Sequence, residues 1–126
     1  MGGATRPFPG AARPYAFPRT ERQVLGNGLV VHVARLDRLP VATVLLMSDA
    51  GAECDAVAGA GVAALTADAL AEGTRRLDAV ALTDAFERLG ASLATGVTWT
   101  YAECSTTVLA RRVPDALRLL AEVARE

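Results

Sequence analysis

The chain has 126 residues, which is enough for one ordinary domain but not for two. Hydrophobic residues make up 52% of the chain, so a core can be buried, and the net charge of −1 argues against nucleic-acid or membrane partners. The chain has no apolar run of the roughly 18 residues needed to span a membrane and no pattern of a secretory signal, so we expect a cytoplasmic protein.

The N-terminal segment, residues 1–20, is rich in proline, which removes backbone donors and opposes regular structure. We therefore expect a flexible arm there and a globular part over residues 21–126. That part begins with two short extended segments, 23–25 and 29–34, about Asn27-Gly28. Asn-Gly is a strong hairpin signal because both residues tolerate a positive φ.

The next elements are a strand, two helices and a second strand-forming stretch. Residues 41–47 are almost continuously apolar, which favours a strand covered on both faces. A loop over 48–61 leads to a helix over 60–72 that Gly73 ends, and Asp78 caps a second helix that runs to Leu89. The apolar faces expected for the two helices are Val62, Leu65, Ala69 and Leu70, and then Leu82, Ala85, Phe86 and Leu89.

Residues 91–110 are rich in β-forming side chains, with a turn expected at 98–100. Pro114 suits the first turn of a third helix. Its apolar stripe is expected at Leu117, Leu120, Ala121 and Ala124. The order β-β-α-α-β-β-α predicts an α+β fold with helices packed on a mostly antiparallel sheet. Because no closing strand follows the third helix, we also expect a truncated half-domain.

Two stretches, 61–74 and 89–97, carry a distinctive pattern of glycines and apolar residues, and the segments 25–31 and 44–51 precede them. In this order the chain resembles the N-terminal part of the pitrilysin/insulinase zinc metallopeptidase family, which includes the mitochondrial processing peptidases. The resemblance covers residues 21–126.

Active members of that family carry H-x-x-E-H on the first helix, where two histidines one helical turn apart bind zinc and the glutamate activates water. The resemblance places Ala64 at the first histidine, Ala67 at the glutamate and Asp68 at the second histidine. Methyl groups cannot bind a metal or accept a proton, and one carboxylate does not hold zinc. We therefore expect no catalytic residue, no metal ligand and no cofactor in this chain.

A second motif of active members, Asn-Ala-x-Thr on the strand after the second helix, helps to hold the substrate peptide. Ala94 falls at the asparagine and Val97 at the threonine, so their side-chain hydrogen bonds are lost. In this family an active and an inactive half enclose the substrate. The resemblance therefore implies a non-catalytic subunit that pairs with an active zinc peptidase in a heterodimer and contacts peptide only within that complex.

Two alternatives remain open: a scaffold or interaction module with no peptidase partner, and a divergent enzyme that uses Asp68 with residues outside this segment. Other polar groups are expected to play structural roles. His32 lacks the partners of a site, and Arg75 and Arg76 suit the C-terminal dipole of the first helix. Cys54 and Cys104 are expected to be buried free thiols. The Asp68 and Glu72 pair and the loop residues Glu53, Cys54 and Asp55 are not expected to form a site, and for Trp99 and Tyr101 a packing role and a partner contact remain equally open.

Overall fold

The computed structural model describes residues 10–12, 14–36 and 38–125. The expected arm over 1–20 lies partly outside these described residues. The chain divides into two compact units, Met1–Leu39 and Pro40–Glu126. None of the helices in the described part is long and apolar enough to cross a membrane.

The first unit contains an antiparallel hairpin of β1 (Thr20–Val24) and β2 (Val30–Ala34). Gly28 has a φ of 87°, and the amide of Leu29 donates to Oδ1 of Asn27 at 3.1 Å. The Asn-Gly turn predicted from the sequence is therefore confirmed.

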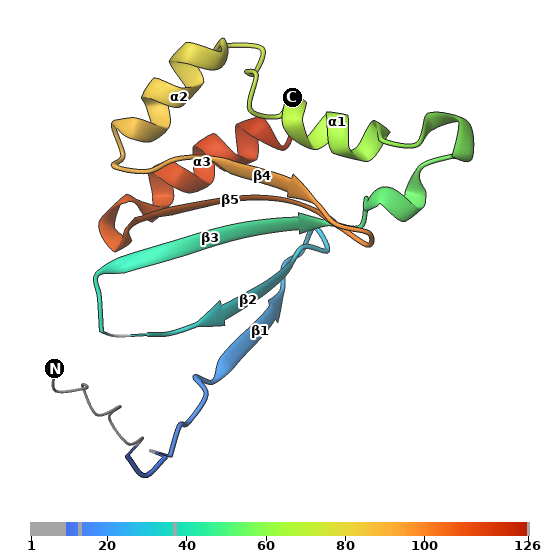
Figure 1. Ribbon diagram of the computed structural model, residues 1–126. Helices are drawn as coiled ribbons and strands as arrows, with labels where there is room; N and C mark the ends of the chain where they lie inside the picture. Colours follow the sequence, from blue (N-terminus) through green and yellow to red (C-terminus); the bar gives the residue numbers. More distant parts are fainter. Residues whose placement is uncertain (1–9, 13, 37, 126) are drawn as a thin grey trace, which may run out of the picture. The chain divides into compact units, whose positions relative to one another are not determined.

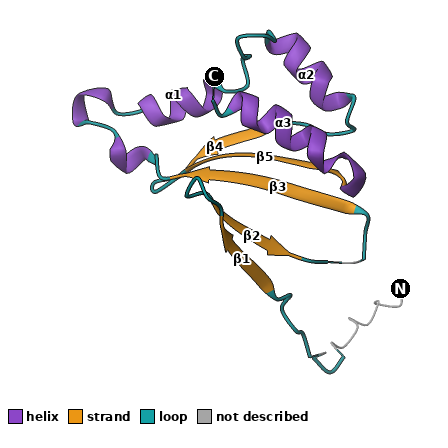
Figure 2. Cartoon of the chain, turned by 180° about the vertical axis from the view of Figure 1, so that it is seen from behind, coloured by secondary structure: helices purple, strands orange, loops and turns teal. Residues whose placement is uncertain are grey.

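The second unit is a three-stranded antiparallel sheet with helices on one face, as Figures 1 and 2 show from opposite sides. The strand order is β3-β5-β4, so β5 is central and pairs with both neighbours. The strands are β3 (Val41–Ser48), β4 (Ala94–Val97) and β5 (Ala102–Leu109), and the helices are α1 (Val62–Ala69), α2 (Ala79–Glu87) and α3 (Val113–Val123). Short 3₁₀ turns occupy Ala52–Cys54, Val57–Gly59 and Ala110–Arg112. This arrangement confirms the α+β class.

The core lies between the helices and one face of the sheet. Its fully buried members come from α2, β5 and α3, and half-buried side chains of β3 pack against them. The core cluster consists of Leu82, Phe86, Cys104, Leu120 and Val123. Burial of side chains on α2 and α3 removes apolar surface from water, at about 25 cal/mol per Å², and so fixes these helices to the sheet.

The opposite face of the sheet is open within residues 40–125. Along β3, exposed Val41, Leu45 and Met47 alternate with half-buried Val44 and Leu46. The prediction that this strand is covered on both faces is therefore wrong. Successive side chains of a strand point to opposite faces of the sheet, and here the helices cover only one of these faces. The continuous apolar run therefore did not indicate that both faces are covered.

The apolar faces predicted for α1 and α3 also need correction. On α1 the buried residue is Ala67, whereas Leu65 is 71% exposed and Val62 is 57% exposed. On α3 the buried stripe is Ala116, Leu120 and Val123 rather than one through Leu117, Ala121 and Ala124. Both helices contain apolar residues on several sides, so spacing alone did not select the buried face. By contrast, Leu82 and Phe86 of α2 are buried as predicted.

Helix α1 ends at Ala69, three residues before the predicted end. The amides of Ala71 and Glu72 donate three residues back, to Asp68 and Ala69, so the chain tightens into turns after the helix. Gly73, with a φ of 141°, then forms an isolated bridge with Asp78 instead of capping α1. The predicted cap of α2 is confirmed, because Oδ1 of Asp78 accepts from the amide of Ala81 at 2.8 Å.

Candidate functional site

Helix α1 carries the three positions at which the sequence places the degenerate zinc motif. Its N-cap residue, Gly61, has a φ of 99° and no side chain to accept the first amides. Asp55, from the preceding loop, takes that role: Oδ2 accepts from the amide of Gly61 at 2.9 Å and Oδ1 from the amide of Ala63 at 3.1 Å. Asp55 thus acts as the N-terminal cap of the helix, and its negative charge interacts favourably with the positive end of the helix dipole.

The three motif positions, at i, i+3 and i+4, lie on one side of α1 but differ in exposure. Ala64 and Asp68, one turn apart, share a face and are both exposed. Ala67 is only 2% exposed, on a helix that packs against β4 and β5. The position that would carry the general base is therefore filled by a methyl group within the packed interior.

These residues do not fit a zinc ion. Tetrahedral zinc needs three or four nitrogen, sulfur or oxygen ligands, and this face of α1 supplies one carboxylate, that of Asp68. Glu72, in the turn after the helix, is exposed as well. Across the described ranges, no group of three or more His, Cys, Asp and Glu side chains converges in a way that could hold a metal ion.

The second degenerate motif occupies β4. Ala94 pairs with Ser105 and Val97 with Ala102, so the two motif positions stand at the two ends of this short strand. Ala94 is exposed and Val97 half-buried. Neither side chain offers a hydrogen bond to a bound peptide.

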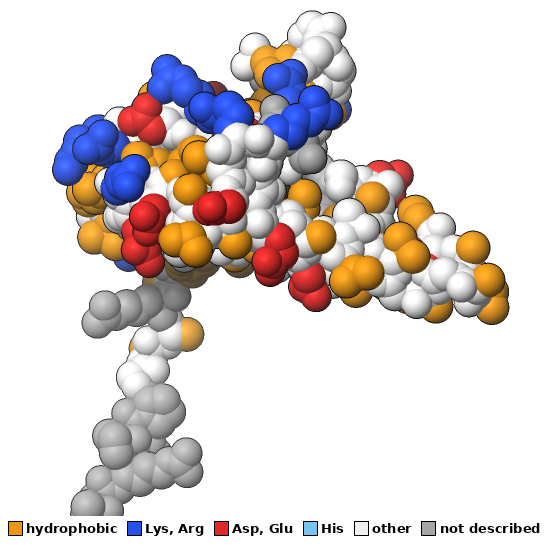
Figure 3. Space-filling view, turned by 90° about the horizontal axis from the view of Figure 1, so that it is seen from above, with side chains coloured by type: hydrophobic (Ala, Val, Ile, Leu, Met, Phe, Trp, Pro, Cys, Tyr) orange, Lys and Arg blue, Asp and Glu red, His pale blue; other side chains and the backbone are white. Residues whose placement is uncertain are grey.

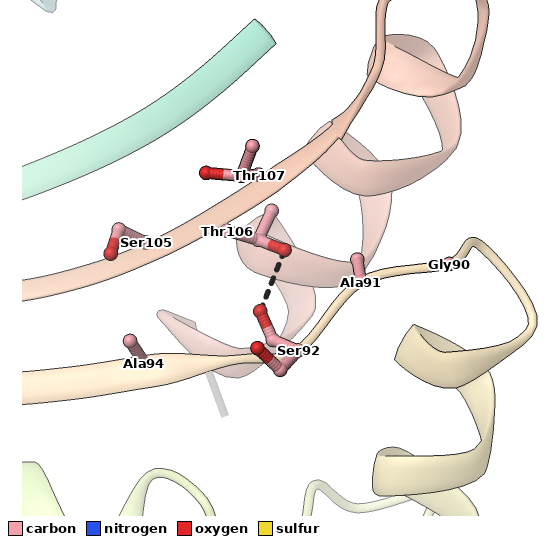
Figure 4. Close-up of a pocket in the computed structure, with 7 residues that line it drawn as sticks. All are labelled: Gly90, Ala91, Ser92, Ala94, Ser105, Thr106 and Thr107. Atoms are coloured by element: carbon pink, nitrogen blue, oxygen red, sulfur yellow. Dashed lines mark hydrogen bonds between the residues drawn. The ribbon is translucent and has the colours of Figure 1, made fainter. Parts of the chain in front are cut away.

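A shallow pocket of about 370 Å³ lies beside the first residue of β4 (Figure 4). Its lining combines Ala94 with the hydroxyl-bearing residues Ser92, Ser105, Thr106 and Thr107. The Thr106 hydroxyl donates to the carbonyl of Ser92 at 2.8 Å, drawn as the dashed line, which secures the segment entering β4. The pocket is therefore polar, uncharged and built mainly from small side chains.

Arg76, which follows the first helix in the sequence, makes structural contacts with a distant helix. Arg76 forms an ion pair with Glu122 of α3, which also accepts from the Thr74 hydroxyl at 2.8 Å. The prediction that Arg76 serves the dipole of α1 is corrected by this long-range contact. The Arg76 and Thr74 hydrogen bonds hold the pKa of Glu122 below its usual range.

The two thiols differ. Cys104 is buried in the core, and burial raises its pKa, whereas Cys54 is exposed, which corrects the expectation that both thiols are buried. Trp99 is 69% exposed at the β4–β5 turn, and Tyr101 is half-buried beside it. His32 is exposed on β2, opposite Arg22 in the hairpin register.

The sequence did not predict the contacts of Asp55 and Glu122, because neither residue stands next to the group that it stabilises. Asp55 is eight residues from Ala63, and Glu122 is 46 residues from Arg76. The available signal for the role of Asp55 was the glycine at the cap position, Gly61, which has no side chain and leaves the first amides of the helix to another acceptor. No local signal predicts the Glu122 contact.

No protein-family model matches this chain, and no curated protein matches it. Among solved structures, it is similar to the inactive domain of an M16 peptidase from Pseudomonas fluorescens, with 32% identity and a TM-score of 0.75. That alignment covers 82% of this chain and 26% of the other. This chain thus spans about a quarter of its relative.

Two further structures share the fold at lower identity. A protease from Helicobacter pylori is 20% identical with a TM-score of 0.78, over 86% of this chain and 26% of that one. Pitrilysin is 20% identical with a TM-score of 0.71, over 84% of this chain and 11% of that one. These likenesses confirm the fold predicted from the glycine and apolar pattern.

Proposed function

We propose that this chain, which belongs to the pitrilysin (M16) peptidase family, is a non-catalytic member that supports an active zinc peptidase. In this proposal it forms one wall of a chamber that encloses the substrate peptide, and a separate family member supplies the zinc and the general base. The inactive domain from Pseudomonas fluorescens, 32% identical, supports the non-catalytic part of this proposal.

The proposal rests on the three residues of α1 that occupy the positions of the zinc motif. Ala67, at the position of the general base, is 2% exposed, and the zinc-ligand positions hold only Ala64 and Asp68. A buried methyl group cannot accept a proton from water, and no neighbouring group in the described segment replaces it. The chain thus combines the fold of the family with a first helix that lacks the zinc ligands and the general base.

The open sheet face supports the role of a chamber wall. Four cross-strand rows cross this face: Met47–Glu103–Gly96, Leu45–Ser105–Ala94, Thr43–Thr107 and Val41–Leu109. The first two rows change from apolar on β3 to polar on β5 and small on β4, the third joins two threonine hydroxyls, and the fourth joins two apolar side chains. A face of this kind can contact both apolar and polar side chains of an enclosed peptide.

Affinity capture of the full-length protein from its source tests this proposal, with a peptide-cleavage assay on the captured material. We expect an H-x-x-E-H homologue to be captured with it and cleavage to stop when a chelator removes zinc. Cleavage by this chain alone, with zinc bound tightly in a one-to-one ratio, would overturn the proposal.

An interaction module without a peptidase partner is the second candidate. It is favoured by the exposed apolar side chains at the α1 end of the molecule, Val57 at 98%, Leu65 at 71% and Val62 at 57%, which a binding partner would cover. Figure 3 shows hydrophobic side chains exposed at this end. Capture of a partner that lacks H-x-x-E-H, with no cleavage, would select this candidate.

A divergent metallopeptidase is the third candidate, in which Asp68 acts with residues outside this segment. The buried methyl group of Ala67 argues against it, because the general base would have to come from another element.

A further inference from the structure

The outer edge of β3, on the side away from β5, carries main-chain groups that the sheet does not use. Among the strands of the described residues, only β5 pairs with β3, and it does so from Val41 to Ser48. The carbonyl of Pro40 accepts from the amide of Ala110, just beyond β5, at 2.8 Å. Main-chain groups alternate in direction along an antiparallel strand, so those of the odd-numbered residues point to the outer edge. These residues are Val41, Thr43, Leu45 and Met47.

This edge lacks the devices by which proteins protect exposed strands. The sequence of β3 is Val-Ala-Thr-Val-Leu-Leu-Met-Ser, with no charge, proline or glycine over eight residues. The strand at the opposite edge of the sheet, β4, is only half as long, with four residues. A long, uncharged and apolar edge is one to which another strand adds through main-chain hydrogen bonds.

The side chains of β3 restrict which strand can add. Val41, Leu45 and Met47 are exposed on the open face of the sheet, whereas Val44 and Leu46 pack against the core on the helix side. An added strand continues both faces, so its own side chains must alternate in the same way. The strand β3 itself has this pattern, with apolar side chains on both faces and no charge.

A second copy of β3 fits this edge in one antiparallel register. A two-fold axis perpendicular to the sheet keeps the helices of both copies on the same side, so odd-numbered residues must lie opposite odd-numbered ones. Val44 then lies opposite its own copy, Val41 opposite Met47, and Thr43 opposite Leu45. This register pairs all four outward-pointing residues of each copy, whereas a shift by two residues in either direction leaves one of them beyond the end of the partner strand.

The pairs formed in this register are all favourable. None of them contains a charge, and each includes at least one β-branched side chain, Val41, Thr43 or Val44, of the kind that packs well across neighbouring strands. The strand is therefore complementary to itself in backbone direction, in face and in side-chain character.

We infer that this chain forms a two-fold symmetric dimer in which the outer edges of two β3 strands pair and join two three-stranded sheets into one of six strands. The contact uses residues 41–47 of each copy, fewer than the roughly 20–30 residues a side of a standard interface, so a Kd on the order of 10 μM is expected. The inference is independent of the proposed function, because edge pairing leaves the open face of the sheet free for a peptidase partner.

Sedimentation equilibrium of the full-length protein, from about 1 to 300 μM, tests the dimer. The average mass should rise from that of one chain to that of two. Thr43→Pro removes one outward-pointing amide and should weaken the dimer at least about tenfold, since proline is tolerated where its missing N–H faces away from the sheet. Thr43→Ala loses the same hydroxyl, which bonds to that of Thr107, but keeps the amide and should still dimerise. Circular dichroism checks that each variant is folded.

Disulfide cross-linking tests the register without altering the backbone, in a Cys54→Ser chain that lacks the exposed thiol. Val41→Cys combined with Met47→Cys places cysteines opposite each other, with Cα atoms about 5.5 Å apart, within the range of a disulfide. Within one copy these two positions are about 20 Å apart and cannot bridge. The control, Val41→Cys combined with Leu45→Cys, places no two cysteines opposite each other.

Mild oxidation should therefore convert the first double variant into a covalent dimer on a non-reducing gel and the control much more slowly. A chain that stays monomeric at the highest concentration would overturn the inference. So would a folded Thr43→Pro variant that dimerises as well as Thr43→Ala, or equal cross-linking of the two double variants.

Discussion

The carboxylate of Asp55 accepts a hydrogen bond from the backbone amide of Ala63, eight residues later, at 3.1 Å. Its other oxygen accepts from the amide of Gly61 at 2.9 Å. One loop side chain therefore satisfies two amides that the first turn of α1 cannot pair internally. The helix that carries the degenerate motif thus depends on a residue outside it.

Replacement of Asp55 by alanine should lower the free energy of unfolding by about 1 kcal/mol, because the first amides of α1 lose their acceptor. Urea denaturation followed by circular dichroism measures this change. Glu53→Ala removes a neighbouring exposed acid and is the matched control, expected to change stability by less than about 0.5 kcal/mol. Equal effects of the two substitutions would show that Asp55 is not a cap.

A glutamate placed at the buried motif position should destabilise the fold. Ala67→Glu must bury a carboxylate where the alanine is 2% exposed, at a cost on the order of 2 kcal/mol. Ala64→Glu, the same change at an exposed position of the same helix, should be nearly neutral. If Ala67→Glu is as stable as Ala64→Glu, the packing around α1 has room for a carboxylate at position 67. The packing would then not explain why this chain lacks a general base there.

How far the sequence predicts this fold depends on whether the signal is local. Asn27-Gly28, Asp78 and Pro114 act within a few residues of themselves, so the hairpin and the starts of α2 and α3 were predicted correctly. The buried faces of α1 and α3 depend on which side meets the sheet. In α1 the small Ala67 is buried while the larger Leu65 is exposed, which hydrophobicity does not predict.

The degenerate motif positions were identified from the resemblance, and their surroundings came from the structure. Spacing predicts that Ala64 and Asp68 share a face, but not that Ala67 lies in the interior. Pairing of Glu103 with Gly96 depends on the β4–β5 register, which the sequence between them does not fix.

The hydrogen bonds of Glu122 should make the free energy of unfolding depend on pH. The pKa of Glu122 is lowered in the folded state by its hydrogen bonds to Arg76 and Thr74, so the folded chain binds this proton less readily than the unfolded chain. The stabilisation is then fully present above the unfolded value of about 4.3 and is lost as pH falls through the lower folded value.

Thermal unfolding between pH 7 and pH 3 tests this expectation. Glu122→Gln should lower the melting temperature at pH 7, and its difference from the unaltered chain should shrink as the pH falls below about 4. Glu87→Gln, at an exposed acid, is the control. A difference that stays constant over this range would show that the Glu122 charge does not contribute.

The two thiols should react at different rates. Cys54 is exposed, whereas Cys104 is 3% exposed and its pKa is raised by burial, so less of it is thiolate at neutral pH. A coloured disulfide reagent should modify one thiol rapidly in the native chain and both in denaturant. Cys54→Ser should abolish the rapid phase, and rapid modification that survives this substitution would place Cys104 at the surface.

The central claim is tested most directly by reconstitution of cleavage from separately purified chains. The full-length protein and an H-x-x-E-H homologue from the same source are assayed alone and mixed, with a fluorogenic peptide and with or without chelator. We predict no cleavage by this chain alone and an increase in chelator-sensitive cleavage when it is added to the homologue. Zinc-dependent cleavage by this chain alone would contradict the account.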